Sequence, residues 1–143
     1  MVGDVVYASN PPSNEAGVVL KVNGTLVFAG VGRVPGNEGS FSASQLQWSD
    51  GGVGFSGIRC QGTVSIPYGN GPYRPTGILR RGNTNTATLY IARDAVSVPA
   101  HIHSESSAAV DCTDFPPPHE TAWEVESTFD LTQAYPEPLR VGW

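Results

Sequence analysis

Alternation of apolar and polar residues is the dominant pattern along this 143-residue chain, and it predicts β-strands. Residues 86–92 alternate without interruption, with Ala87, Leu89 and Ile91 on one face and polar or amphipathic side chains on the other. Residues 123–131 follow the same rule and place Trp123 on the apolar face, where we expect it in the core. Both segments therefore predict half-buried strands.

A hairpin is predicted where Asn23 and Gly24 separate the β-rich runs 17–22 and 25–29, because both turn residues accept positive φ. Other segments have shorter strand patterns. These are residues 41–48, residues 53–60 with a bulge at Gly57, residues 63–66, and residues 96–103, where Pro99 restricts the strand to an edge. The polar segment 104–120 has the least regular pattern of the chain.

Apolar residues do not recur at helical spacing over three turns, and short strands follow one another at intervals typical of all-β proteins. We therefore predict an all-β fold, an antiparallel β-sandwich or jelly roll, as a single domain over residues 1–143. Residues 1–12 and the Pro-rich residues 134–143 are predicted to be extended N- and C-terminal arms that dock on neighbouring molecules.

Composition excludes several classes of protein. The 17 Gly and 12 Pro residues disfavour helical bundles. A net charge of −5 disfavours nucleic acid as a partner, and the apolar runs are too short for membrane insertion. The N-terminus lacks the pattern of a secretory signal, so we expect synthesis in a cytoplasm. Cys60 and Cys112 are too few for a disulfide framework, and we expect two small buried apolar residues rather than a bridge.

His101 and His103 form the strongest candidate for metal chemistry, because residues two apart on a strand point to the same face. Two ligands are fewer than the three that a catalytic zinc site usually takes from the protein. A homotrimer would bring six imidazoles to its axis, an arrangement suited to Fe or Ni. A cupin-like site would require a further Glu and His at spacings that this chain lacks. The simpler interpretation is a pair of solvated surface histidines.

Nucleophilic and acid–base catalysis have weak support in the sequence. The chain lacks the Gly-x-Ser-x-Gly elbow of hydrolases. Glu124, Glu126 and Asp130 alternate in a way that resembles a glycosidase pair, but on the polar face of a strand they are more simply a solvated surface. We therefore predict no catalytic residues and a protein that is not an enzyme.

Carbohydrate binding is a second possibility, because aromatic rings stack on sugars. The aromatic residues considered for this role are Trp48, Tyr68, Tyr73, Tyr90, Trp123, Tyr135 and Trp143. Tyr68, Tyr73 and the adjacent Arg74 are the preferred ligand-binding candidates, because they lie in a Gly- and Pro-rich loop, where binding residues collect.

The segment from Ile66-Pro67-Tyr68-Gly69 to Tyr73-Arg74-Pro75 resembles tail-fibre and tail-tip proteins of tailed bacteriophages. In those proteins a strand ends at a Pro-x-Gly turn, Tyr-Arg-Pro follows, and a Thr-rich strand comes next, which here is residues 85–91. The opening segment 3–9 is similar to the start of phage minor tail proteins. The resemblance covers about half of the chain, and there is no shaft or collagen-like repeat.

This resemblance implies a structural virion protein of the tail tip, baseplate or a minor tail component, made in the host cytoplasm. It also implies neighbouring virion proteins and host cell-surface glycans as partners, and a metal ion held by His-x-His pairs on a trimer axis. The residues alone leave two alternatives open, a stand-alone lectin-like domain and a small cupin-like metal-binding protein around His101 and His103.

Overall fold

The computed structural model describes residues 5–10, 13–69, 72–81, 85–107, 110–114, 116 and 119–141. Within this part, all strand ladders are antiparallel and form two sheets, so the predicted all-β class is confirmed. Residues 1–4, 11–12 and 142–143 of the two predicted arms lie outside the described residues, as do residues 70–71 of the predicted binding loop.

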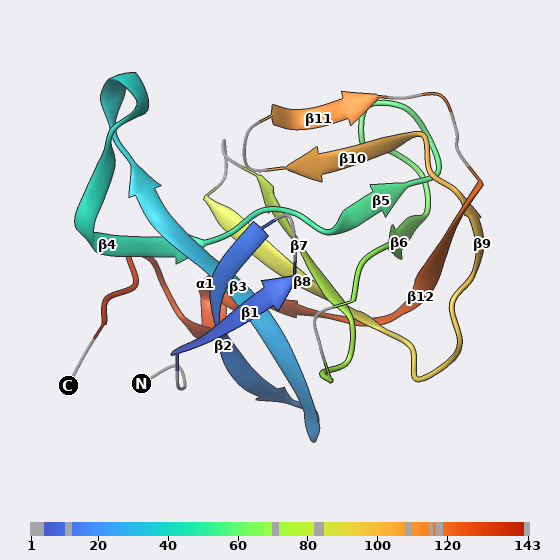
Figure 1. Cartoon of the computed structure of the whole chain (residues 1–143), viewed down its shortest axis with the longest axis horizontal. Helices are drawn as coiled ribbons and strands as arrows, with labels where there is room; N and C mark the ends of the chain where they lie inside the picture. Colours follow the sequence, from blue (N-terminus) through green and yellow to red (C-terminus); the bar gives the residue numbers. More distant parts are fainter. Residues whose placement is uncertain are drawn as a thin grey trace.

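The smaller sheet has the strand order β1-β2-β3-β4. Its strands are β1 (Val5–Asn10), β2 (Ser13–Val22), β3 (Thr25–Pro35) and β4 (Phe41–Trp48), and the 3-10 turn η1 (Asn37–Gly39) connects the last two. The predicted hairpin at Asn23-Gly24 is confirmed, with φ values of 49° and 82°. The turn between β3 and β4 projects beyond the rest of the chain (Figure 1).

The larger sheet has eight strands in the order β11-β10-β5-β6-β12-β8-β7, with β9 paired to β12. Its strands are β5 (Val53–Phe55), β6 (Val64–Ile66), β7 (Thr76–Arg81), β8 (Thr86–Ala92), β9 (Val98–His101), β10 (Ser104–Ser107), β11 (Val110–Asp114) and β12 (His119–Asp130). The sheet curls into a half-barrel, and the predicted jelly-roll sandwich is not confirmed.

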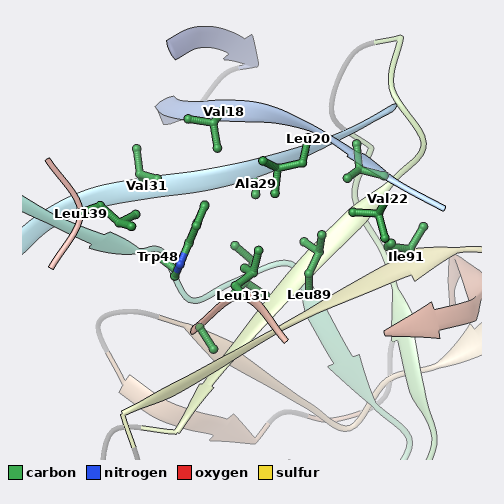
Figure 2. Close-up of a cluster of buried hydrophobic side chains, with 13 residues drawn as sticks. Val18, Leu20, Val22, Ala29, Val31, Trp48, Leu89, Ile91, Leu131 and Leu139 are labelled. Atoms are coloured by element: carbon green, nitrogen blue, oxygen red, sulfur yellow. The ribbon is translucent and has the colours of Figure 1, made fainter. Parts of the chain in front are cut away.

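The main core lies between β2 and β3 of the smaller sheet and β7 and β8 of the larger one (Figure 2). The predicted alternation in β8 is confirmed, because Ala87, Leu89 and Ile91 are all buried. Trp48 of β4 is fully buried at the end of this core. Further buried apolar side chains lie outside this cluster, and they are Phe28, Val53, Phe55, Ile66, Ala92, Ile102 and Ala122.

Several predicted boundaries and one predicted core position are wrong. The strand expected over residues 53–60 ends at Phe55, since Arg59 and Cys60 adopt positive φ in a turn. The strand expected to reach Leu131 ends one residue earlier, because the Asp130 side chain accepts a hydrogen bond from the Gln133 N–H (2.9 Å) and caps the short helix α1 (Leu131–Ala134). Trp123 is half-buried and packs near Gly69, outside the main core.

The predicted C-terminal arm docks on its own chain in its described part. Leu139 is buried in the main core, and its backbone exchanges two hydrogen bonds with Leu46 of β4 (2.9 and 2.8 Å). Residues 5–10 of the predicted N-terminal arm form β1, which pairs with β2. Both segments are therefore part of the folded body. Within the described residues, no helix is long and apolar enough to cross a membrane.

Candidate functional site

Tyr68 and Tyr73 lie between β6 and β7, in the loop that the sequence predicted. Tyr68 is 54 % exposed, and its hydroxyl donates a hydrogen bond to Glu105 Oε1 (3.3 Å). Tyr73 is half-buried. Their side chains therefore remain partly accessible at the surface, as a binding role requires.

Arg74, by contrast, serves as a structural link. Its side chain is 19 % exposed, and the guanidinium forms ion pairs with Asp94 (3.3 Å) and Glu126 (3.4 Å). It also donates a hydrogen bond to the carbonyl oxygen of Ala92 (3.2 Å). These three contacts tie the β6–β7 loop to β8 and β12, so they occupy the group that the sequence assigned to a ligand.

His101 is the last residue of β9, and His103 lies in the short connection between β9 and β10. His101 is exposed at the end of β9 and lies opposite His119 of β12 in the strand register. The His103 N–H donates to the carbonyl oxygen of Phe55 (2.9 Å), so at His103 the chain has already joined β5. Among the described residues, there is no group of three or more His, Cys, Asp or Glu side chains placed to hold a metal ion.

A groove of about 550 Å³ runs along one side of β9. It is lined by Ser56, Thr63, Val64, Ser65, Tyr90, Arg93, Val98, Pro99, Ala100, His101, Ala122, Glu124 and Val125. The lining combines apolar side chains from β9 and β12 with hydroxyl groups from β6 and the β5–β6 loop. A mixed lining of this kind is typical of sites for small polar molecules.

Arg93 and Glu124 form the charged part of the groove. Their side chains are paired at 3.1 Å and are 58 % and 59 % exposed. The Arg93 N–H also donates to the carbonyl oxygen of Glu124 (2.8 Å), which fixes the two backbones relative to each other. Tyr90, in the middle of β8, pairs with Gly77 of β7 and Thr128 of β12. Tyr90 and Glu124 are therefore carried by paired strands, and Arg93 directly follows β8.

The β5–β6 loop forms the hydroxyl-bearing end of the groove. Ser56 and Thr63 close this loop, because the Ser56 N–H donates to the Thr63 carbonyl oxygen (3.0 Å) and the Thr63 N–H donates to Ser56 Oγ (2.8 Å). Ser104 of β10, which is fully buried, supports the loop from behind. Its Oγ accepts from the Cys60 N–H (2.9 Å) and donates to the carbonyl oxygen of Gly57 (2.6 Å).

A disulfide joins Cys60 of this loop to Cys112 of β11, so the expectation of two unbridged cysteines is wrong. Their Cα atoms are 5.8 Å apart, within the range that a disulfide requires. The Arg59 N–H donates to Asp114 Oδ1 (2.6 Å) beside the bridge. The two cysteines are 52 residues apart in the sequence, and only the pairing of β5, β10 and β11 brings them together.

The groove was largely missed at the sequence level. Of its lining residues, the sequence indicates His101 as a metal candidate and Tyr90 as one of several aromatic residues, and it predicts a solvated face for Glu124. The strands that meet here come from positions 56 to 125, and no local pattern marks their meeting point. No protein-family model, no curated protein and no solved structure matches this chain.

Proposed function

We propose that this protein is a non-enzymatic structural module of a bacteriophage tail. In this proposal it assembles as a homotrimer, contacts neighbouring virion proteins of the tail tip, baseplate or minor tail, and contacts host surface glycans. The resemblance of residues 66–75 to tail-fibre and tail-tip proteins supports the virion assignment. For the fold, the proposal retains an antiparallel β-sandwich of the jelly-roll type.

The observation that carries the assembly part of the proposal is the β3–β4 hairpin, which projects beyond the core (Figure 1). Residues 35–41, which form its tip, are all exposed, and Phe41 is 65 % exposed. The Arg33 guanidinium donates to the carbonyl oxygens of Ser42 (3.1 Å) and Ala43 (2.6 Å), so the two strands are fastened to each other outside the core. A stiff projection with an exposed aromatic ring is suited to insertion into a second copy of the chain.

The disulfide is consistent with a final location in the virion. Structural disulfides persist in oxidising surroundings and are found on virion surfaces, whereas the cytosol keeps thiols reduced. A protein made in the host cytoplasm and released within a particle would meet such surroundings after lysis. The bridge between Cys60 and Cys112 would then form or become permanent outside the cell.

Light scattering coupled to size-exclusion chromatography tests the assembly. We expect a trimer for the wild type and a shift to monomer for Phe41→Ser. Val96→Ser is the matched control, since Val96 is also an exposed apolar residue (86 %) but lies in the β8–β9 connection, away from the hairpin. A wild type that is monomeric throughout the micromolar range would contradict the proposal. Mass spectrometry of purified particles tests the virion location separately.

A stand-alone lectin-like domain is the second candidate, and the groove along β9 is the observation that favours it. This candidate shares the glycan ligand but does not require self-assembly. A monomeric protein that selects particular monosaccharides would favour the lectin, whereas a trimer found in purified virions would favour the tail module.

A further inference from the structure

We propose that the groove along β9 binds a neutral saccharide in its pyranose form. The inference deepens the proposed function, on which it rests for the source of the glycan at the host surface. The site differs from the loop of Tyr68, Tyr73 and Arg74 that the sequence favoured, because the Arg74 guanidinium is already engaged by Asp94 and Glu126.

The charge of the groove selects against ionic ligands. Besides His101, its lining carries one basic and one acidic side chain, Arg93 and Glu124, and these are paired with each other at 3.1 Å. A phosphate, sulfate or carboxylate group would meet the Glu124 carboxylate, and an ammonium group would meet the Arg93 guanidinium. A hydroxyl group, by contrast, both donates to a carboxylate and accepts from a guanidinium, so vicinal hydroxyls can bridge this pair with charge-assisted hydrogen bonds.

The apolar part of the groove fits the other face of a sugar ring. Val98 and Pro99 of β9 are exposed, and they line the groove together with the hydroxyl-bearing β5–β6 loop. The ring of Tyr90 adds a half-buried aromatic surface with a polar end. A pyranose has an apolar C–H surface and a rim of hydroxyl groups, and it can therefore contact both kinds of lining at once.

The volume of the groove and the rigidity of its lining are suited to a small ligand. The volume of 550 Å³ lies within the range of about 300–1,000 Å³ that small-molecule sites occupy. The charged pair is anchored by the hydrogen bond from the Arg93 N–H to the Glu124 carbonyl oxygen, and the β5–β6 loop is anchored by the disulfide and by Ser104. A preformed site of this kind loses little conformational freedom when it binds.

The chain offers a matched control for the test. Glu124 and Glu126 both lie on β12, both are exposed, and each forms an ion pair with one arginine (3.1 and 3.4 Å), but only Glu124 lines the groove. A glycan array with neutral, sialylated and sulfated members identifies the preferred sugar for the wild type. Calorimetric titration with that sugar then compares Glu124→Gln with Glu126→Gln, after unfolding curves have established that both variants are folded.

We expect selective binding of neutral glycans, a loss of about tenfold or more in affinity for Glu124→Gln, and a change within about twofold for Glu126→Gln. A preference for sialylated or sulfated glycans, no binding of any neutral glycan, or equal losses in the two variants would overturn the inference. These outcomes are independent of the oligomeric state. A trimer that binds no glycan refutes the saccharide site and the glycan contact but leaves the assembly standing, and a glycan-binding monomer refutes the assembly alone.

Discussion

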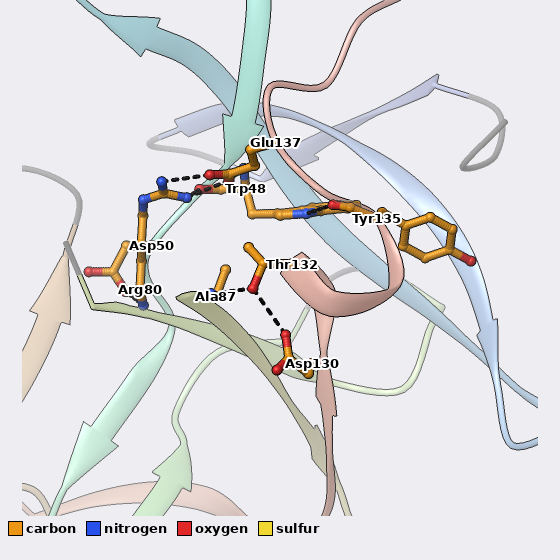
Figure 3. A network of polar contacts seen from close by, with 8 residues as sticks. All are labelled: Trp48, Asp50, Arg80, Ala87, Asp130, Thr132, Tyr135 and Glu137. Atoms are coloured by element: carbon orange, nitrogen blue, oxygen red, sulfur yellow. Dashed lines mark hydrogen bonds and ion pairs between the residues drawn. The ribbon is translucent and has the colours of Figure 1, made fainter. Parts of the chain in front are cut away.

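Arg80 and Glu137 form a bidentate ion pair that joins the two sheets at one end of the core (Figure 3). Arg80 Nη2 lies 2.7 Å from Glu137 Oε2, and Nη1 pairs with Oε1. Oε1 also accepts a hydrogen bond from the Trp48 N–H (2.8 Å). Arg80 belongs to β7, an edge of the larger sheet, and Trp48 belongs to β4, an edge of the smaller sheet. Glu137 therefore holds together two strands that are not paired directly.

Removing one partner of this pair should be costly, because both side chains are largely buried, with exposed fractions of 15 % and 14 %. Glu137→Gln leaves the Arg80 charge without its counter-ion, and we expect the free energy of unfolding to fall by about 3 kcal/mol. Denaturant unfolding measures the change. The control is Glu124→Gln in the exposed pair with Arg93, where a loss below about 1 kcal/mol is expected. Equal losses at the two pairs would contradict a special role for Glu137.

Truncation after Tyr135 should destabilise the folded body itself. The truncation removes Leu139, which is buried against the main core, and it uncovers the backbone groups of Leu46 on the outer edge of β4. We expect a loss of at least about 4 kcal/mol from the missing burial and the missing ion pair.

Uncovered strand edges also pair with other chains, so the truncated protein should associate as its concentration rises. Light scattering at increasing concentration detects this association, and the full-length protein is the control. If this segment were an arm for docking on neighbours, truncation would instead leave the stability unchanged and reduce assembly.

Reduction of the Cys60–Cys112 bridge should lower the free energy of unfolding, mainly because it raises the conformational entropy of the unfolded chain. For a loop of 52 residues, the chain-entropy relation gives about 4 kcal/mol. Denaturant unfolding with and without a reducing agent measures the difference, and the Cys60→Ser/Cys112→Ser double variant should lose a similar amount and no longer respond to the reducing agent. An unchanged unfolding midpoint under reduction would show that the bridge contributes nothing to stability.

Gly77→Ala tests the close approach of β7 to the β4–β5 connection. A Cβ atom at Gly77 would lie 2.3 Å from the carbonyl oxygen of Gly52, a backbone atom that has no freedom to rotate away. We expect a loss of about 1–3 kcal/mol, as for overpacking in a core. Gly32→Ala is the control, because the nearest neighbour of its Cβ would be the hydroxyl of Ser49 at 3.2 Å, and a side chain can move. Similar losses at both positions would argue against the steric explanation.

Local sequence determined those parts of the fold in which neighbouring residues carry the information. The turn at Asn23-Gly24 follows from the tolerance of these two residues for positive φ, and the orientation of β8 follows from the alternation of its side chains. Pro99 predicts an edge strand, because proline has no N–H to donate to a second neighbour. In the described structure β9 pairs with β12 alone. In these cases the prediction required only the strand period and the backbone preferences of single residues.

Tertiary structure decided the features that depend on partners distant in the sequence. Residues 104–107 and 110–114 form β10 and β11, because β5 supplies backbone partners for β10 and β10 for β11, and this pairing brings Cys112 to Cys60. The pairing of β8 with β12 places Arg93 beside Glu124, and β12 also pairs with β6 and β9, so residues of all four strands line one groove. Cross-strand hydrogen bonds and ion pairs of this kind are made by backbone groups and surface side chains that leave no periodic pattern in the sequence. Their geometry is therefore set only when the sheets close on the common core.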